Sequence, residues 1–157
     1  MISKSIKNVQ CMKKNDAWTT PDDFFKKQND IWNFTIDLAA SKENTKCNRF
    51  YDKEDNSLEK SWAGEIGWLN PPYSEIELWV KKANEEAKHA FIVALVFAKT
   101  DTKWFHNYVY KKWEIEFIKG RLKFGDGKNP APYGSMLIYF GDYDRRMVQN
   151  KRSSSSS

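Results

Sequence analysis

The sequence predicts an α/β fold, in which helices cover both faces of a single doubly wound sheet. Helical and strand patterns alternate along most of the chain, which is typical of this class. Residues 90–98, "AFIVALVFA", form an unbroken apolar run of the kind buried on both faces of a parallel sheet. A chain of 157 residues, 40% of them hydrophobic, can build one domain with a sizeable core but not two comfortable ones.

The first half of the chain begins with a helix signal. A helix is expected over residues 20–32, because Thr20 can cap it and Pro21 suits its first position. A short strand is expected at 34–38. The stretch that follows carries mixed signals, and we expect it to hold a short helix, a short strand at 49–51 and a loop around Asp55.

The second half is expected to alternate strands and helices. Ser74 and Glu77 have the spacing of a capping box and predict a helix whose apolar residues recur up to position 87. Another helix is expected from Asp101 to residue 113. Strands are expected at 66–69, 90–98, 114–118 and 135–140.

Both ends of the chain are polar. We expect residues 1–15 and the serine-rich segment 146–157 to be flexible, because they have little apolar surface to offset the entropy of ordering, and residues 16–145 to form the domain. The first residues lack the apolar core of a secretory signal, and no run approaches the roughly 20 apolar residues needed to span a bilayer. We therefore expect a cytosolic protein.

Charge and cysteine usage exclude some classes of site. The net charge of +5, with both signs interspersed, is compatible with a nucleic-acid partner and equally with an ordinary surface. Cys11 and Cys47 lie far apart, which fits a reducing compartment. His89 and His106 have no Cys or His neighbours at ligand spacing, so no metal is expected.

Residues 66–73, "IGWLNPPY", place two prolines and a tyrosine directly after a strand. Proline has no N–H, and both prolines push the preceding residue toward extended geometry, so the strand ends abruptly at Asn70. In open α/β sheets, ligands bind outside the carboxyl ends of the strands. We therefore interpret Asn70, Pro71, Pro72 and Tyr73 as a functional site rather than a simple turn.

This turn resembles the catalytic motif of amino-group methyltransferases that use S-adenosylmethionine. Over residues 18–141 the chain resembles the phage-type DNA adenine methyltransferase (Dam-like) family, with seven segments in the same order. They are "TPDDFF" (20–25), "FTIDLAASKENTKC" (34–47), "FYDKEDNSLEKSW" (50–62), "WLNPPYSEIELWVKKA" (68–83), "TDTKWFH" (100–106), "FIKGRLKF" (117–124) and "GSMLIYF" (134–140). The resemblance implies a Rossmann-like methyltransferase domain, S-adenosylmethionine as cofactor, double-stranded DNA as partner and the cytoplasm of a bacterial host.

The reaction explains the residue types of the motif. The amino nitrogen of adenine is a poor nucleophile, because its lone pair is delocalised into the ring. If the side-chain oxygen of Asn70 and the carbonyl of Pro71 accept its two hydrogens, the lone pair can point at the sulfonium methyl. The base must leave the double helix to reach this pocket, where Tyr73 can stack on it.

The resemblance also assigns cofactor contacts. Thr20 and Pro21 match a segment against the methionine end of the cofactor, and Asn70 adjoins the same site. Asp37 matches the acidic residue that ends the first strand and faces the cofactor's ammonium group, and Asp55 matches a position near its adenine. No glycine-rich turn follows Asp37, where "LAAS" stands instead.

Recognition of DNA is expected from loops, since no separate recognition domain is visible. Residues 120–135 are the leading candidate, with Arg121 and Lys123 as contacts, although the same segment can equally be a hairpin between the last two strands. Two other functions remain open: a methyltransferase acting on a protein glutamine amide, and a non-catalytic nucleic-acid-binding module. The recognition sequence and the oligomeric state stay undetermined.

Overall fold

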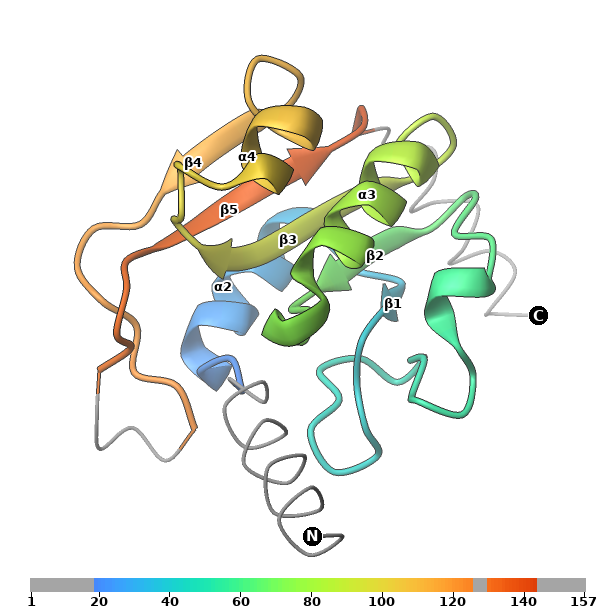
Figure 1. Ribbon diagram of the computed structural model, residues 1–157. Helices are drawn as coiled ribbons and strands as arrows, with labels where there is room; N and C mark the ends of the chain where they lie inside the picture. The colour runs from blue at the N-terminus through green and yellow to red at the C-terminus, as the bar shows by residue number, and fades with distance from the viewer. Residues whose placement is uncertain (1–18, 126–129, 144–157) are drawn as a thin grey trace, which may run out of the picture.

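A computed structural model describes residues 19–125 and 130–143 of the chain (Figure 1). The predicted flexible ends, 1–15 and 146–157, lie outside these residues. The helices are α2 (Asp22–Trp32), α3 (Ile76–Glu86) and α4 (Lys103–Tyr108), with the short 3-10 helices η1 (Ser57–Glu59) and η2 (Tyr73–Glu75). The strands are β1 (Ile36–Asp37), β2 (Ile66–Leu69), β3 (Phe91–Phe97), β4 (Glu114–Phe117) and β5 (Ser135–Phe140).

The five strands form one mixed sheet in the order β1-β2-β3-β5-β4. β1, β2 and β3 are parallel, whereas β5 runs antiparallel to both of its neighbours, β3 and β4. The carboxyl ends of β1, β2 and β3 therefore meet at one edge of the sheet, which is the edge where a ligand is expected in this class of fold. The predicted α/β class is confirmed.

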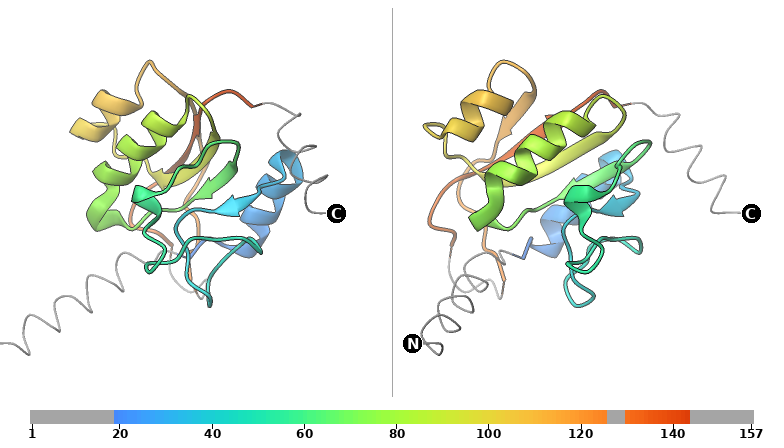
Figure 2. Two further views of the ribbon diagram at one scale, coloured as in Figure 1. Left: turned by 90° about the vertical axis from the view of Figure 1, so that its right-hand side faces the viewer. Right: turned by 45° about the vertical axis from the view of Figure 1, so that its right-hand side comes forward.

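Helices cover both faces of the sheet, as predicted (Figure 2). All seven residues of β3 are buried, and its alternate side chains enter two different cores. Ile92, Ala94 and Val96 pack in the core that includes α3 and α4. The others, Phe91 among them, share a second core with Phe25 of α2. Burial on both faces is the reason why this strand is apolar throughout.

The helices begin and end differently from the prediction. α2 begins at Asp22 with Pro21 as its N-cap, so Thr20 is not the cap. η2 precedes α3, which begins at Ile76 with Glu75 as its N-cap, so the helix starts later than the predicted capping box of Ser74 and Glu77 implies. The extra turn arises because the N–H of Glu75 donates to the carbonyl of Pro72, at 3.2 Å.

α4 and β1 are both shorter than predicted. α4 ends at Tyr108, and the chain then turns with Lys111 at a φ of 63°, a left-handed conformation that a helix does not accommodate. β1 comprises two residues, and a parallel bridge joins Asp37 to Phe50 within the segment predicted as a short strand at 49–51. The predicted short helix of this region corresponds to η1.

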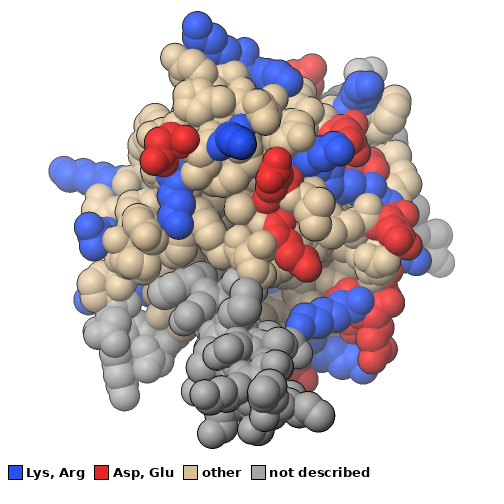
Figure 3. Space-filling view, in the orientation of Figure 1, with Lys and Arg blue, Asp and Glu red and all other residues tan. Residues whose placement is uncertain are grey.

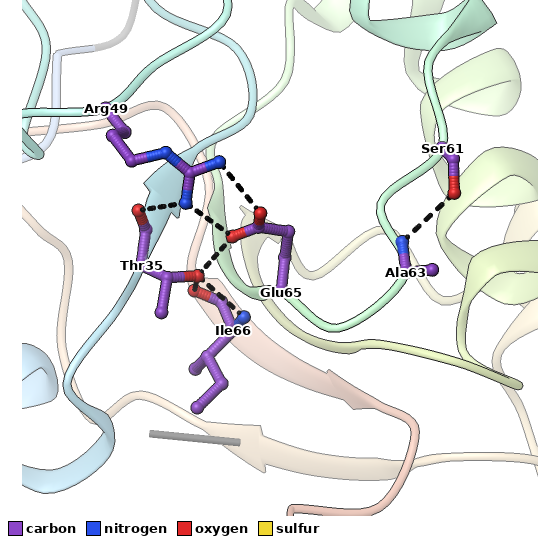
Figure 4. Close-up of polar contacts among 6 residues, drawn as sticks. All are labelled: Thr35, Arg49, Ser61, Ala63, Glu65 and Ile66. Atoms are coloured by element: carbon purple, nitrogen blue, oxygen red, sulfur yellow. Dashed lines mark hydrogen bonds and ion pairs between the residues drawn. The ribbon is translucent and has the colours of Figure 1, made fainter. Parts of the chain in front are cut away.

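A polar network fixes the amino ends of β1 and β2, opposite the expected ligand edge (Figure 4). Glu65 is 5% exposed and forms an ion pair with Arg49, with Nη2 and Oε1 2.9 Å apart. The hydroxyl of Thr35 donates to Glu65 and accepts the N–H of Ile66 at 2.9 Å. The network ties the segment around Arg49 to both strands.

Within the described ranges, no helix is long and apolar enough to cross a membrane.

Candidate active site

A cavity of about 720 Å³ opens at the carboxyl ends of β1 and β2. Four of the residues singled out in the sequence line it: Thr20, Asp37, Asn70 and Pro72. They come from the segment before α2, the end of β1 and the turn after β2, so folding brings together distant residues such as Thr20 and Asn70, which are 50 positions apart. Residues 39–58 supply much of the remaining wall.

A hydrogen bond joins Asn70 to Thr20 across this cavity wall. The amide Nδ2 of Asn70 donates to the hydroxyl oxygen of Thr20 at 2.9 Å, and Thr20 is 3% exposed. In this arrangement the amide nitrogen faces Thr20, so the amide oxygen points the other way. Thr20 thus orients the amide instead of capping α2.

Asp37 is a buried carboxylate in the cavity wall, with 3% of its surface exposed. Its oxygens accept the backbone N–H of Lys46 at 3.0 Å and, more weakly, that of Ala39 at 3.4 Å. Burial raises the pKa of Asp37 to about 6, against the opposing effect of these hydrogen bonds and of the Lys46 charge. A buried carboxylate with so elevated a pKa is a site that an ammonium group would complement.

Tyr73 lies on the other side of the NPPY turn. Its hydroxyl donates to the carbonyl of Phe97 at 3.2 Å, and its ring lies 4.8 Å from the ring of Phe97. Burial raises the pKa of Tyr73 above its ordinary value. Neither Tyr73 nor Pro71 is among the described residues that line the cavity. The turn therefore presents Asn70 to the cavity and Tyr73 to the end of β3.

The structure places Asp55 at the surface rather than at the cavity. Its carboxylate accepts the backbone N–H of Asp52 at 2.9 Å, and Asp55 is not among the described residues that line the cavity. Asp52, Asn56 and Ser57 of the same loop do line it. Asp55 therefore shapes the loop, and its neighbours reach the cavity.

Arg121 and Lys123 are exposed and lie outside the cavity. The segment that holds them pairs as a hairpin, since the N–H of Ala131 donates to the carbonyl of Leu122 at 3.0 Å. Arg121 Nη1 also donates to the carbonyl of Ala131, at 3.4 Å. Gly125 of the same segment donates to the carbonyl of Thr19 at 3.1 Å, which joins it to the chain that enters the site.

Among the residues of the cavity wall that sequence reasoning missed are Ser57 and Trp79. They are 4% and 8% exposed, and neither Ser57 Oγ nor Trp79 Nε1 has a hydrogen-bond partner among the described residues. Buried polar atoms are nearly always paired, so a ligand with donors and acceptors suits this part of the wall. Trp79 falls at an apolar position of the helix predicted after Ser74, and nothing in the sequence distinguishes Ser57.

A comparison with protein families decides what kind of site this is. Residues 7–153 match the family model described as "DNA N-6-adenine-methyltransferase (Dam)". The chain belongs to this family. The Dam family uses S-adenosylmethionine as methyl donor. The cavity fits that molecule in its chemistry, with a buried carboxylate for an ammonium group and unpaired polar atoms for a nucleoside.

Two phage proteins are similar to this Dam-family chain. The DNA N-6-adenine-methyltransferase of Escherichia phage T1 is 32% identical over 143 residues, which are 88% of this chain and 60% of the phage protein. The DNA N-6-adenine-methyltransferase of Haemophilus phage HP1 is 34% identical over 135 residues, 80% of this chain and 78% of that protein. The chain thus spans less than two thirds of the length of the T1 relative.

Within residues 19–125 and 130–143, no cluster of three or more His, Cys, Asp or Glu could hold a metal ion.

Proposed function

We propose that this protein transfers a methyl group from S-adenosylmethionine to N6 of adenine in double-stranded DNA. The observation that carries the proposal is the hydrogen bond from Asn70 to Thr20 at the edge of a cavity that also contains Asp37. It fixes the direction of the one side chain that has to accept a hydrogen from the adenine amino group. Membership of the Dam family supports both the reaction and the substrate.

The NPPY turn acts on the amino group of the base. S-adenosylmethionine supplies a methyl group bound to a positively charged sulfur. The side-chain oxygen of Asn70 and the carbonyl of Pro71 accept the two amino hydrogens, so that the nitrogen lone pair points at the methyl carbon. Methyl transfer to this nitrogen would release the cofactor as a neutral thioether, and the surplus amino proton would pass to water. Pro72 has no N–H and holds these acceptors in an extended backbone.

Other residues around the cavity hold the cofactor. Asp37 binds the ammonium group through its buried carboxylate. Thr20 and Pro21 lie against the methionine end, and Thr20 also orients Asn70. The Asp55 loop contacts the nucleoside through its neighbours that line the cavity, with Asp55 itself supporting the loop.

Arg121 and Lys123 contact the DNA. Both are exposed on a hairpin that Gly125 attaches to the entrance of the site. The face with α3 and α4 shows both signs of charge interspersed (Figure 3), so it offers no broad basic field. Arg121 and Lys123, two cations beside the site, therefore supply the phosphate contacts. The similarity to phage proteins supports action in the cytoplasm of a bacterial host.

The decisive experiment identifies the methylated product. Purified protein is incubated with plasmid DNA and isotope-labelled S-adenosylmethionine, and the DNA is digested to nucleosides for mass spectrometry. We expect labelled N6-methyladenine and little or no N4-methylcytosine, with the initial rate of labelling lowered at least about a hundredfold in the Asn70→Ala variant. Label on a protein glutamine would favour the rival methyltransferase, and DNA binding without any label would favour a non-catalytic module.

A further inference from the structure

A cluster of two tyrosines and a lysine lies at the carboxyl end of β3, beside the NPPY turn. Lys99 Nζ lies 5.2 Å from the centre of the Tyr73 ring and 4.4 Å from the centre of the Tyr133 ring. Both distances are within the reach of a cation–π contact. The three residues come from the turn after β2, the end of β3 and the approach to β5. None of them lines the cofactor cavity.

The cluster is held on a buried aromatic side chain. The ring of Phe97, which is 4% exposed, lies 4.8 Å from the ring of Tyr73 and 5.5 Å from that of Tyr133. The backbone of Lys99 is bound on both sides: its N–H donates to Phe97 at 2.8 Å, and its carbonyl accepts the hydroxyl of Thr102 at 2.8 Å. The rings and the Lys99 backbone are therefore fixed, whereas the Lys99 side chain has a flexible four-carbon stem.

The relative strengths of two contacts decide what occupies these rings when DNA is bound. A cation–π contact at an exposed site favours association by about 2- to 5-fold. Stacking of a base on an aromatic side chain favours it by roughly 5- to 150-fold. An extruded base therefore displaces the ammonium from the ring faces. Tyr133 is 47% exposed, so a base can reach it without disturbing the core.

We propose that Tyr73 and Tyr133 together form the stacking surface for the adenine extruded from DNA. In the free protein Lys99 covers this surface, and on binding its ammonium moves to a neighbouring phosphate, where its charge is strongly favoured. The proposal rests on the proposed function, because it takes the NPPY turn as the place where the amino group is methylated. It adds Tyr133 and Lys99 to the substrate side of the site.

Base extrusion gives a direct test of Tyr133. The methylation site is first mapped on methylated plasmid DNA, and the thymine opposite the target adenine is then probed with permanganate in a duplex of that sequence, where its reactivity rises when its partner base leaves the helix. We expect Tyr133→Ala to lose most of this rise and to increase the KM for DNA about tenfold, with the affinity for S-adenosylmethionine unchanged. Tyr133→Phe keeps the ring and should restore the signal.

Lys99 is tested through the salt dependence of DNA binding. Replacing one phosphate-binding lysine lowers the slope of log Kd against log salt concentration by about 1. We expect this change in Lys99→Met and not in Lys99→Arg. Tyr110 and Lys111 supply matched controls, because Tyr110 is 48% exposed and Lys111 Nζ lies 5.5 Å from its ring centre, away from the NPPY turn. Tyr110→Ala and Lys111→Met should match the wild type in extrusion and in salt slope respectively.

The outcomes separate this inference from the function on which it rests. Wild-type protein that neither extrudes the base nor methylates DNA would overturn both. Wild-type protein that is active, together with a folded Tyr133→Ala variant that extrudes the base fully, would overturn the stacking surface alone. An unchanged salt slope in Lys99→Met would overturn the movement of Lys99 to a phosphate.

Discussion

The orientation of one side-chain amide links the cofactor cavity to the substrate side. Thr20 holds the nitrogen of the Asn70 amide at 2.9 Å, and it does so from a buried position that water does not reach easily. An amide that could rotate would present its donor end to the adenine amino group in part of the population, and that end repels an amino hydrogen. In the proposed function Thr20 is therefore a positioning residue, and Asn70 is the residue that would touch the base.

This difference in role predicts different losses of activity. Asn70→Ala should lower kcat by at least about a hundredfold, as expected for the loss of one preorganised partner of the transition state, with cofactor affinity near that of the wild type. Thr20→Val removes the acceptor but keeps the shape, and should lower kcat by roughly three- to tenfold, because the amide remains and only its orientation is lost. Steady-state kinetics and calorimetry measure both. Full turnover by Asn70→Ala would contradict the assigned chemistry.

The packing of β1 against β2 depends on a glycine directly below the site. Gly67 pairs with Ile36 of β1 and Ile92 of β3. A Cβ at this position would clash with Leu38, coming within 3.0 Å of its Cγ and closer still to its Cδ1. Leu38 is fully buried, so it has little room to move. The size of residue 67 therefore controls the position of the chain that carries Asp37.

Gly67→Ala should consequently destabilise the protein by about 1–3 kcal/mol, the usual cost of overpacking a core. For a domain of this size the melting temperature should fall by roughly 2–4 °C per kcal/mol. Leu38→Val removes one methylene from the opposing side chain, so the double variant should be more stable than the sum of the two single changes predicts. Thermal unfolding of all four proteins measures this coupling, and strictly additive losses would argue against the clash.

The accuracy of the sequence predictions varies from element to element for physical reasons. β3 and β5 were predicted to within a residue at each end, because burial on both faces leaves an apolar run with clear limits. α4 was predicted too long because aromatic residues continue at helical spacing beyond Tyr108. Trp113, the last of them, instead donates its indole N–H to Asn84 at 2.9 Å, a contact that depends on the position of α3.

In the candidate site, too, some residues could be predicted from the sequence and others could not. Thr20, Asp37 and Asn70 belong to segments that carry the family resemblance, and the fold brings all three to one cavity; their roles stay predictions. Lys99 adjoins Tyr73 because β3 lies beside β2, and Tyr133 joins them because β5 lies beside β3; no local pattern of the sequence encodes that neighbourhood. Residues that meet through sheet topology require the structure.

At the scale of the whole molecule, the buried carboxyl of Asp37 makes the stability of the empty protein depend on pH. The ordinary pKa of Asp37 is 3.8, and burial raises it to about 6 in the fold. A carboxyl whose folded pKa is raised stabilises the fold fully at a pH below the unfolded value, and this contribution disappears as the pH rises through about 6. At neutral pH the ionised Asp37 thus destabilises the empty protein, by at most about 3 kcal/mol. An ammonium ligand would relieve that cost and stabilise the complex.

Asp37→Asn should therefore make the empty protein more stable while it abolishes tight cofactor binding. The amide has a single acceptor oxygen for the two backbone N–H groups, which costs about 1 kcal/mol, so the net gain at pH 7.5 should be roughly 1–2 kcal/mol, or about 3–6 °C in melting temperature. The gain should shrink as the pH falls below 6, reach zero near pH 5 and reverse toward pH 4, because the wild-type carboxyl becomes more stable as it is protonated. The affinity of the wild type for S-adenosylmethionine should fall roughly tenfold between pH 7 and pH 5 and stay flat in the variant. Melting curves and calorimetry across this pH range test both halves, and a variant less stable than the wild type at pH 7.5 would mean that the carboxylate is already compensated within the fold.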